Sequence, residues 1–134
     1  MICNICRSNA AASFETTDNK IYWSCTFCGC KYLDKSFFID LQEEEKRYLE
    51  HNNDVKDKEY RKFLSKLSNP LKEKICHGCD GLDFGCGTGP ALADMLIEEG
   101  FKVSLYDPFF YPKKDVLSKQ YDFITCTETA EHFH

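Results

Sequence analysis

A run of three glycines between a short apolar segment and an apolar helix constrains the fold of this chain more than any other feature. Residues 81–84 (Gly-Leu-Asp-Phe) are expected to form a strand that leads directly into residues 85–89 (Gly-Cys-Gly-Thr-Gly). Pro90 suits the first position of a helix, where its missing N–H is not needed. Glycines let a backbone approach a ligand closely, and the first turn of a helix offers free N–H groups. The run therefore predicts a strand–loop–helix unit with a ligand-binding loop.

The residues after this loop continue as a helix and a second strand. Gly100 is placed to end the helix, and residues 101–106 alternate as a strand that stops at Asp107. Asp107 lies 22 residues after Gly85, close to the spacing of about 20 residues typical of nucleotide-binding folds. An acid at the end of the second strand can accept hydrogen bonds from both hydroxyls of a ribose. The buried stripe of the helix is expected to comprise Ala91, Leu92, Met95 and Leu96.

The glycine spacing separates two classes of nucleotide-binding protein. Dinucleotide-binding folds carry G-x-G-x-x-G, whereas the third glycine here comes one residue early, which disfavours an NAD-binding protein. The pattern Asp83-x-Gly85-x-Gly87-x-Gly89 resembles motif I of the class I S-adenosylmethionine-dependent methyltransferases. The resemblance implies that the loop wraps the methionine and ribose parts of S-adenosylmethionine, with the first acid positioning the methionine end and the later acid binding the ribose. The cofactor-binding residues that it implies are Asp83, Gly85, Cys86, Gly87, Thr88, Gly89 and Asp107.

A third segment resembles the same family. Residues 121–126 read as another strand, and residues 127–132 (Thr-Glu-Thr-Ala-Glu-His) follow it. They resemble the fourth-strand motif of these methyltransferases, a strand followed by E-x-x-E-H. The resemblance implies that Glu128 faces the pocket, with Glu131 and His132 close to it. Glu128 and His132 are the candidate catalytic residues, as general bases, and a structural hydrogen-bonding role for His132 is the alternative.

The chain departs from the family pattern in the stretch after Asp107. Only 13 residues separate Asp107 from Tyr121, so the usual helix and third strand cannot both fit there. Aromatic rings offer a flat face that binds without specific hydrogen bonds. We therefore expect Phe109, together with Phe110 and Tyr111, to stack on the adenine of the cofactor. For the two acids of the site, Asp83 and Asp107, an ordinary turn role is the alternative.

The resemblance covers residues from about 80 to 134, the first half of the catalytic fold. It implies an α/β fold with part of a Rossmann-like methyltransferase domain, truncated after the fourth-strand motif. Three strands alone would leave an exposed sheet edge. A partner chain or a missing C-terminal half is therefore expected to complete the sheet.

Two cysteine pairs near the N-terminus predict a separate metal-binding module. Cys3-x-x-Cys6 and Cys25-x-x-Cys28 are separated by 18 residues, a spacing typical of a zinc ribbon. Two tight turns can each place two thiolates on a tetrahedral ion, and four thiolates leave no open position, so the zinc is expected to be structural. Gly29 suits such a turn. Two disulfides and unligated core cysteines are the alternatives.

The remaining cysteines and the composition bear on the compartment. Nine cysteines is an odd number, and no signal peptide precedes them, so a reducing, cytoplasmic location is expected. Cys76 and Cys79 form a further Cys-x-x-Cys pair, interpreted as a loop before a strand, with a metal or redox element as the alternative. No apolar run approaches the roughly 20 residues of a membrane span. The net charge of −5 disfavours a broad nucleic-acid-binding face.

The charged segment between these parts is expected to be a helical linker. Asp40 and Glu43 can form a capping box, and Asn52-Asn53 is expected to interrupt the helix. Asn69-Pro70 is expected to end a second helix, because proline disfavours a helical residue before it. The apolar face of that helix comprises Tyr60, Phe63, Leu64 and Leu67.

These features predict three segments: a zinc-ribbon-like module at 1–39, a charged helical linker at 40–74 and the partial methyltransferase domain at 75–134. The resemblance implies methyl transfer from S-adenosylmethionine to a small molecule or to RNA. The alternative is a non-catalytic zinc-binding interaction module with a vestigial cofactor-binding half-domain.

Overall fold

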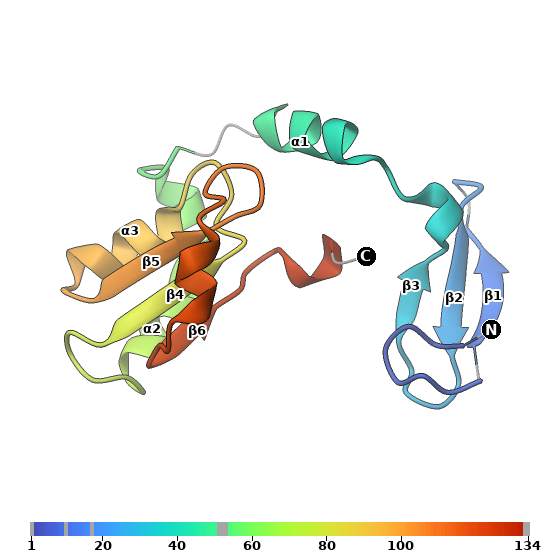
Figure 1. The fold of residues 1–134 in the computed structure, drawn as a ribbon, viewed down its shortest axis with the longest axis horizontal. Coiled ribbons are helices and arrows are strands. Elements are labelled where there is room, and N and C mark those ends of the chain that lie inside the picture. Colours follow the sequence, from blue (N-terminus) through green and yellow to red (C-terminus); the bar gives the residue numbers. More distant parts are fainter. Residues whose placement is uncertain (1, 10, 17, 51–53, 133–134) are drawn as a thin grey trace. The chain divides into compact units, whose positions relative to one another are not determined.

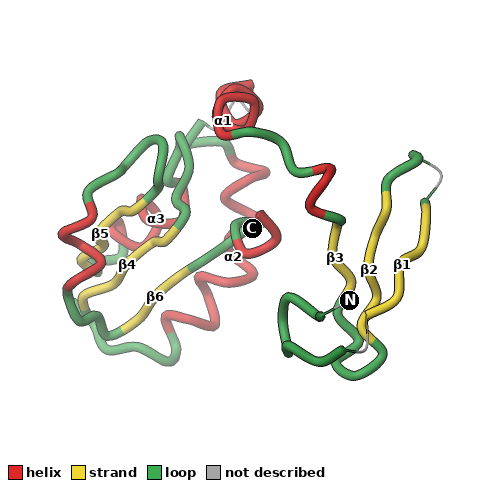
Figure 2. The backbone as a smooth tube through the Cα atoms, turned by 45° about the vertical axis from the view of Figure 1, so that its right-hand side comes forward, coloured by secondary structure: helices red, strands yellow, loops and turns green. Residues whose placement is uncertain are grey.

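A computed structural model describes residues 2–9, 11–16, 18–50 and 54–132. The chain forms two compact units that meet between Leu41 and Gln42 (Figure 1). The first unit is built from strands and loops with one short 3-10 helix, whereas the second combines helices with a sheet (Figure 2). Each unit is described by itself below.

The first unit is a three-stranded antiparallel sheet. Strands β1 (Ala11–Glu15), β2 (Ile21–Cys25) and β3 (Lys31–Leu33) pair in that order. A short 3-10 helix, η1 (Lys35–Phe37), follows β3, and the side chain of Asp34 caps it. The cysteine turns lie at one end of this sheet, before β1 and between β2 and β3.

The second unit contains a parallel sheet of three strands. β4 (Asp80–Phe84) lies at the centre, with β5 (Lys102–Tyr106) on one side and β6 (Phe123–Thr125) on the other. Gly81 allows this packing, because a Cβ added there would lie 2.1 Å from the Cζ atom of Phe123. The parallel directions bring the loops after all three strands to one edge of the sheet.

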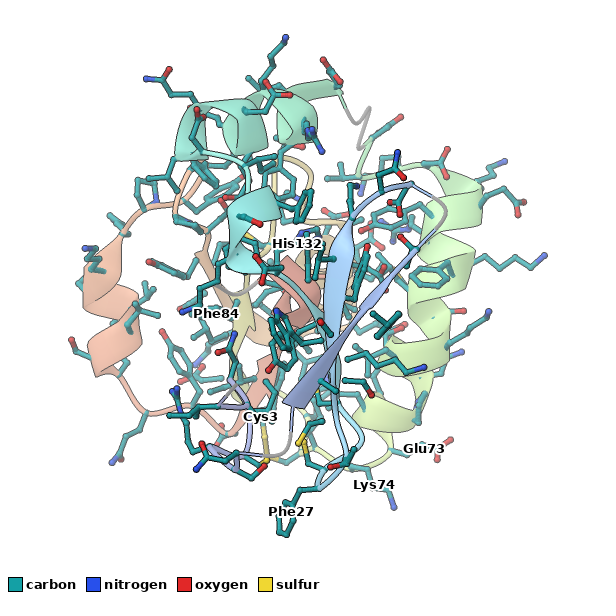
Figure 3. All side chains as sticks on the ribbon, turned by 90° about the vertical axis from the view of Figure 1, so that its right-hand side faces the viewer. Cys3, Phe27, Glu73, Lys74, Phe84 and His132 are labelled. Atoms are coloured by element: carbon teal, nitrogen blue, oxygen red, sulfur yellow. A yellow bond between two sulfur atoms is a disulfide. The ribbon has the colours of Figure 1, made fainter. Side chains whose placement is uncertain are left out.

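Helices cover both faces of this sheet. α2 (Lys58–Lys72) and α3 (Ala91–Glu98) pack together on one face, while the 3-10 helix η2 (Lys114–Ser118) lies on the other (Figures 1 and 3). Gly100, with φ +89°, follows α3 as expected. Among the described residues, no helix has the length and apolar character to span a membrane. The buried core comprises Leu64, Cys79, Ala91, Leu92, Leu96, Phe101 and Phe123.

The charged helical segment is more than a connection. α1 (Leu41–Glu50) has no buried residue, but α2 places Leu64 in the core of the second unit with an exposed fraction of 2%. Lys56 and Arg61 also form ion pairs with Asp94 and Glu98 of α3. α2 is therefore part of the same packed unit as the sheet.

The prediction that Asn69-Pro70 ends this helix is wrong. α2 continues through Pro70 to Lys72, and Leu71 packs against the core. Proline in the last turn removes only one intrahelical hydrogen bond, to the carbonyl of Lys66, and burial of Leu71 offsets that loss. The expected interruption at Asn52-Asn53 lies outside the described residues.

Two other expectations concern short connections. Between β5 and β6 the structure contains η2 and no strand, so the absence of a third family strand is confirmed. Cys76 and Cys79 lie in the loop before β4, as expected, and they form a disulfide bond. This pair therefore does not offer two free thiolates to a metal.

Candidate functional site

The glycine loop lies at the carboxyl end of the central strand and is fixed to both neighbouring strands. The N–H groups of Gly85 and Cys86 donate to the carbonyl of Tyr106 at the end of β5, at 2.7 and 3.2 Å. On the other side, Oγ1 of Thr129 lies 3.1 Å from the carbonyl oxygen of Gly85. These contacts hold the loop between the end of β5 and the segment that follows β6.

Gly85 and Gly87 meet the conformational demand of this loop. Their φ angles are +72° and +65°, a region that residues with a Cβ rarely adopt. At Gly85 a Cβ would also lie 2.2 Å from Cγ2 of Thr129. At Gly87 nothing lies within 4 Å of the same position. A side chain at position 85 would therefore collide with Thr129, whereas at position 87 the space beside the loop is open.

Asp107 directly follows β5, and its side chain contacts the glycine loop. Oδ2 of its buried carboxylate accepts from Gly87 N at 3.0 Å, and Oδ1 accepts from Phe109 N and Phe110 N at 2.9 and 3.1 Å. A carboxylate has about four acceptor positions, so these bonds leave one of them for a ligand. The expectation that Asp107 accepts two ribose hydroxyls thus requires one of the three backbone bonds to give way.

Asp83 precedes the glycine loop and is the second-to-last residue of β4. Its carboxyl group has an exposed fraction of 3% and accepts a 2.7 Å hydrogen bond from Oγ1 of Thr125 on β6. Burial raises the pKa of Asp83 to about 6, although the Thr125 bond lowers it. Asp83 thus places an almost uncompensated negative charge beneath the loop at neutral pH.

The thiol between these two acids stays protonated at neutral pH. Burial, together with the charges of Asp83 and Asp107, raises the pKa of Cys86 to about 12. Only a thiolate is an effective nucleophile. The side chain of Cys86 is therefore unsuited to nucleophilic attack, in agreement with a role for its backbone alone.

Glu128 and His132 follow β6 at the same edge of the sheet. Glu128 is exposed and adopts a left-handed backbone conformation, with φ +51°. The charges of Asp83 and Glu128 both act on the hydroxyl of Tyr60, whose pKa is raised first by burial and then by these two charges. Tyr60 of α2 therefore belongs to this edge, although its sequence position suggested only packing. The side chain of Glu131 lies outside the described residues.

Four rings form one cluster at this edge, those of Tyr48, Phe109, Phe110 and His132. The ring of Tyr48, from α1, lies 6.0 Å from Phe109, 6.5 Å from Phe110 and 5.8 Å from His132, measured between centroids. Phe109 and Phe110 follow Asp107 by two and three residues, so the stretch expected to contact adenine is in contact with α1. Among the described residues, no hydrogen bond joins Glu128 to His132; instead His132 packs edge-on against Tyr48.

Several residues of this edge escaped the sequence interpretation. Thr125 could have been found, because it lies opposite Asp83 in the register of β4 and β6, once those strands are taken as neighbours. Thr129 sits within the recognised fourth-strand motif, but nothing in its position indicated contact with Gly85. Tyr48 and Tyr60 lie on helices far away in sequence, so only the tertiary structure could reveal them.

The second candidate site is formed by the four paired cysteines of the first unit. The Sγ atoms of Cys3, Cys6, Cys25 and Cys28 all lie within 4.8 Å of one another. The Cys3–Cys28 and Cys6–Cys25 separations are 3.8 and 3.7 Å. Four thiolates at about 2.3 Å from a tetrahedral zinc ion are about 3.8 Å apart. The spacing of the sulfur atoms thus fits this ion, and these four cysteines are free thiols.

The two cysteine turns have the same backbone design. Arg7 N donates to Cys3 O at 3.1 Å, and Gly29 N donates to Cys25 O at 2.8 Å. Arg7 and Gly29 each follow the first cysteine of their turn by four residues, and both have positive φ angles, of 62° and 73°. Gly29 was expected from the sequence, whereas Arg7 at the equivalent position was not.

Neighbouring groups shift the pKa values of three of these thiols. Oγ of Ser8 lies 3.2 Å from Cys6 Sγ and 3.4 Å from Cys25 Sγ, and this contact lowers the pKa of both cysteines, that of Cys25 to about 6. The hydrogen bond at Cys30 lowers the pKa of Cys28, but burial and the adjacent thiols raise it to about 12. The thiolate, the form that binds a metal, is therefore favoured at Cys25, whereas Cys28 keeps its proton until an ion binds.

The fold and the glycine-loop edge define the class of this protein. A parallel sheet with a glycine loop after its central strand and an acid after the next strand is a cofactor-binding α/β unit. A family model described as a methyltransferase domain matches residues 46–134, and the chain therefore belongs to this family. The match begins within α1 and includes all of α2. No curated protein and no solved structure matches the chain.

Proposed function

We propose that this protein transfers a methyl group from S-adenosylmethionine, with the second unit binding the cofactor and the first unit stabilised by a structural zinc ion. The family match supports methyl transfer and gives no support to the alternative of a non-catalytic interaction module. The observation that carries the cofactor assignment is the glycine loop bound through Gly87 N–H by Asp107, with the buried carboxyl of Asp83 in the strand that precedes it.

The residues of this edge fit the chemical groups of S-adenosylmethionine. Open space beside Gly87 allows the cofactor to approach the backbone. The remaining acceptor position of Asp107 suits a ribose hydroxyl. The negative charge of Asp83 complements the ammonium group of the methionine end, and the ring of Phe109 offers a flat surface for the adenine. Cys86, Thr88 and Gly89 contribute backbone to this binding loop.

When bound, S-adenosylmethionine supplies a methyl group that its positive sulfur makes electrophilic. The contribution of the protein is to align that group with the acceptor and to exclude water. Glu128 and His132, which follow β6 at the same edge, are the candidates to take a proton from the acceptor. Both side chains are exposed, and an acceptor bound over this edge would reach them from solvent.

The four-cysteine cluster supports the proposed zinc ion. Its sulfur separations match a tetrahedral thiolate site, and the first unit has few buried apolar residues of its own. Because binding and folding are coupled in such modules, the ion would supply stability that the core does not. The free thiols of this cluster support the proposed cytoplasmic location, because a reducing environment preserves them, whereas the disulfide between Cys76 and Cys79 gives that proposal no support.

Calorimetric titration with S-adenosylhomocysteine tests the cofactor assignment. We expect saturable binding that Asp107→Asn weakens by about tenfold or more, since the neutral amide is a poorer acceptor for both the loop N–H and a ribose hydroxyl. Asp115→Asn, at an exposed acid of η2, is the matched control and should bind as the unmodified protein does. Absence of heat at about millimolar ligand, with the fold intact by circular dichroism, would rule the assignment out.

A further inference from the structure

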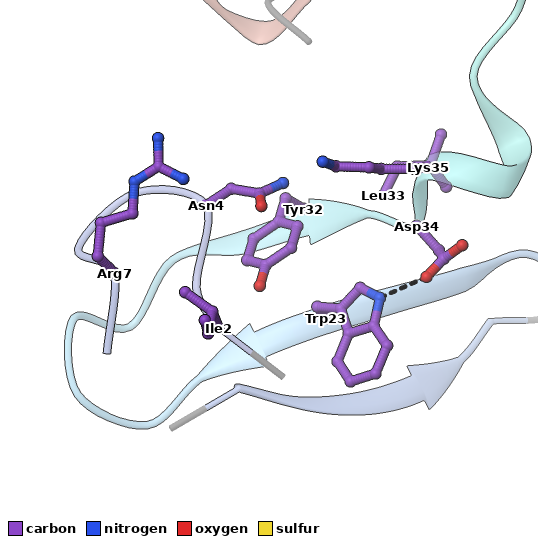
Figure 4. Close-up of a pocket in the computed structure, with 8 residues that line it drawn as sticks. All are labelled: Ile2, Asn4, Arg7, Trp23, Tyr32, Leu33, Asp34 and Lys35. Atoms are coloured by element: carbon purple, nitrogen blue, oxygen red, sulfur yellow. Dashed lines mark hydrogen bonds between the residues drawn. The ribbon is translucent and has the colours of Figure 1, made fainter. Parts of the chain in front are cut away.

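A pocket of the first unit lies outside both sites described above. Its volume is about 530 Å³, within the range of small-molecule sites. One wall is the first cysteine turn, and the other is the face of β2 and β3 with the residues that follow β3 (Figure 4). The pocket is lined by Ile2, Asn4, Arg7, Trp23, Tyr32, Leu33, Asp34 and Lys35. None of these side chains belongs to the four-cysteine cluster.

The aromatic part of the pocket is held rigidly. Trp23 lies opposite Tyr32 in the register of β2 and β3, so both side chains are on the same face of the sheet. The indole Nε1–H donates to Asp34 Oδ2 at 2.6 Å, and Oδ1 of the same carboxylate accepts from the backbone and hydroxyl of Ser36. The indole is thus fixed at the pocket, where its face can stack on a planar ring.

The polar part of the pocket is cationic. Arg7 and Lys35 are exposed, and neither forms an ion pair with another described residue. The one acid of the lining, Asp34, is already bound by Trp23 and Ser36. The positive charge is local to Arg7 and Lys35, because residues 1–41 contain four basic and four acidic side chains and a zinc ion (+2) on four thiolates (−4) would add a net −2. These two side chains can bind an anion at the pocket, and Asn4 adds an amide that can both donate and accept hydrogen bonds.

We propose that this pocket binds a nucleotide, with the base on Trp23 and the phosphate between Arg7 and Lys35. A nucleotide combines the three groups that the pocket can bind: a planar base for Trp23, an anionic phosphate for the two cations, and polar base edges for Asn4. The nucleotide can belong to a nucleotide-linked small molecule or to a single strand of RNA. Affinity should rise with the number of linked nucleotides only if the ligand is RNA. Binding at this pocket does not depend on the proposed cofactor site.

The chain has a single tryptophan, so its fluorescence reports on this pocket alone. We would titrate the zinc-loaded full chain with uridine monophosphate and with a hexauridylate strand. Stacking on the indole should quench the emission saturably with both ligands, and added salt should weaken binding. Equal affinities for the two would identify a single nucleotide as the ligand, whereas affinity at least about tenfold higher for the strand would identify RNA.

Paired variants separate binding from folding. Arg7→Gly removes a cation but retains the left-handed backbone, as Gly29 does in the equivalent turn. Combined with Lys35→Gln, it should weaken binding of either ligand by about tenfold or more. Lys31→Gln, at a lysine of β3 outside the pocket lining, is the control and should change nothing.

Two results would overturn the proposal. One is the absence of quenching by both ligands at about 10 mM, in protein that retains its zinc. The other is unchanged affinity in the Arg7→Gly/Lys35→Gln protein. If the unmodified protein does not bind S-adenosylhomocysteine but its tryptophan emission is still quenched, the cofactor assignment fails while the nucleotide site stands.

Discussion

At the scale of a single residue, the proposed function gives Asp83 a role in ligand binding that comes at the expense of stability. Its carboxyl is buried beneath the glycine loop with one hydroxyl partner, Thr125. In the unfolded chain the group ionises near its usual pKa of 3.8, whereas the folded protein holds the proton up to a pKa of about 6. The folded state therefore binds more protons in this interval, and stability falls as the pH rises through it.

We expect Asp83→Asn to stabilise the cofactor-free protein at pH 7. The variant avoids a buried charge, and each pKa unit corresponds to about 1.4 kcal/mol, so the gain should be on the order of 2–3 kcal/mol. Urea denaturation at several pH values measures it. The advantage should shrink below pH 4, where Asp83 is protonated in both states, and a constant advantage at all pH values would contradict the explanation.

The two loop glycines should respond differently to alanine. Both substitutions place a Cβ in a left-handed conformation, at a cost of about 1–2 kcal/mol. Gly85→Ala also forces a contact with Thr129, and overpacking of this kind costs about 1–3 kcal/mol more. Thermal denaturation of the two variants should therefore show the larger loss for Gly85→Ala.

The double variant Gly85→Ala/Thr129→Ala provides the control for that comparison. It removes the two nearest atoms, Cγ2 and Oγ1 of Thr129, and should recover part of the stability. If Gly87→Ala proves as destabilising as Gly85→Ala, the contact with Thr129 is not the cause.

At the scale of elements, α2 illustrates how packing overrides local signals. The sequence predicted the helix but misplaced its end at Pro70, because the preference of the residue before proline is a local rule. Of the predicted apolar face Leu64 is buried, whereas Phe63 and Leu67 are exposed. Burial of Leu71 and ion pairs from Arg61 to α3 are tertiary effects that no local rule contains.

The strands on either side of the glycine loop and its helix were predicted to within one residue at each end, since their apolar runs and bounding glycines are local. The strand predicted at 121–126 is shorter in the structure, as β6, and β1 and β3 were not predicted.

Leu64→Ala should cost the second unit about 2–5 kcal/mol in the free energy of unfolding, because the side chain is fully buried in the core. Leu67 lies one turn later on the same helix, with an exposed fraction of 38%. Leu67→Ala should therefore cost less than about 1 kcal/mol. Equal effects in urea denaturation would show that α2 is a loosely attached connection.

The candidate site was predictable as far as its chemistry lies in consecutive residues. The glycine loop, Asp83 and Asp107 follow from the order strand, loop, helix, strand and acid. Thr129, which contacts the loop, and Tyr48, which contacts Phe109, come from separate segments, and their positions depend on how those segments pack. The engagement of Asp107 by three backbone N–H groups likewise depends on a turn that the sequence pattern does not specify.

At the scale of the whole molecule, the two units should lose structure separately. We expect about one zinc ion per chain, and a chelator should unfold residues 1–41 alone, because only that unit depends on the ion. Trp23 lies in this unit, so its emission should shift to the red while the helical circular dichroism of the second unit persists. Less than about half an equivalent of zinc would contradict the metal site.

The control is Cys25→Ser, which removes one of the four ligands. It should lower the zinc content and expose Trp23 without changing the thermal midpoint of the second unit. Loss of the helical signal together with the tryptophan shift would mean that the units fold as one.

The disulfide between Cys76 and Cys79 has a practical consequence when it is set beside the four-cysteine cluster. The chain holds one disulfide and seven free cysteines. With zinc on four of these, a thiol reagent applied to the native protein would find Cys30, Cys86 and Cys126, and of these the protonated, partly buried Cys86 should react slowly. Two fast equivalents, rising to six when the metal is removed, would report metal occupancy and oxidation state in one titration.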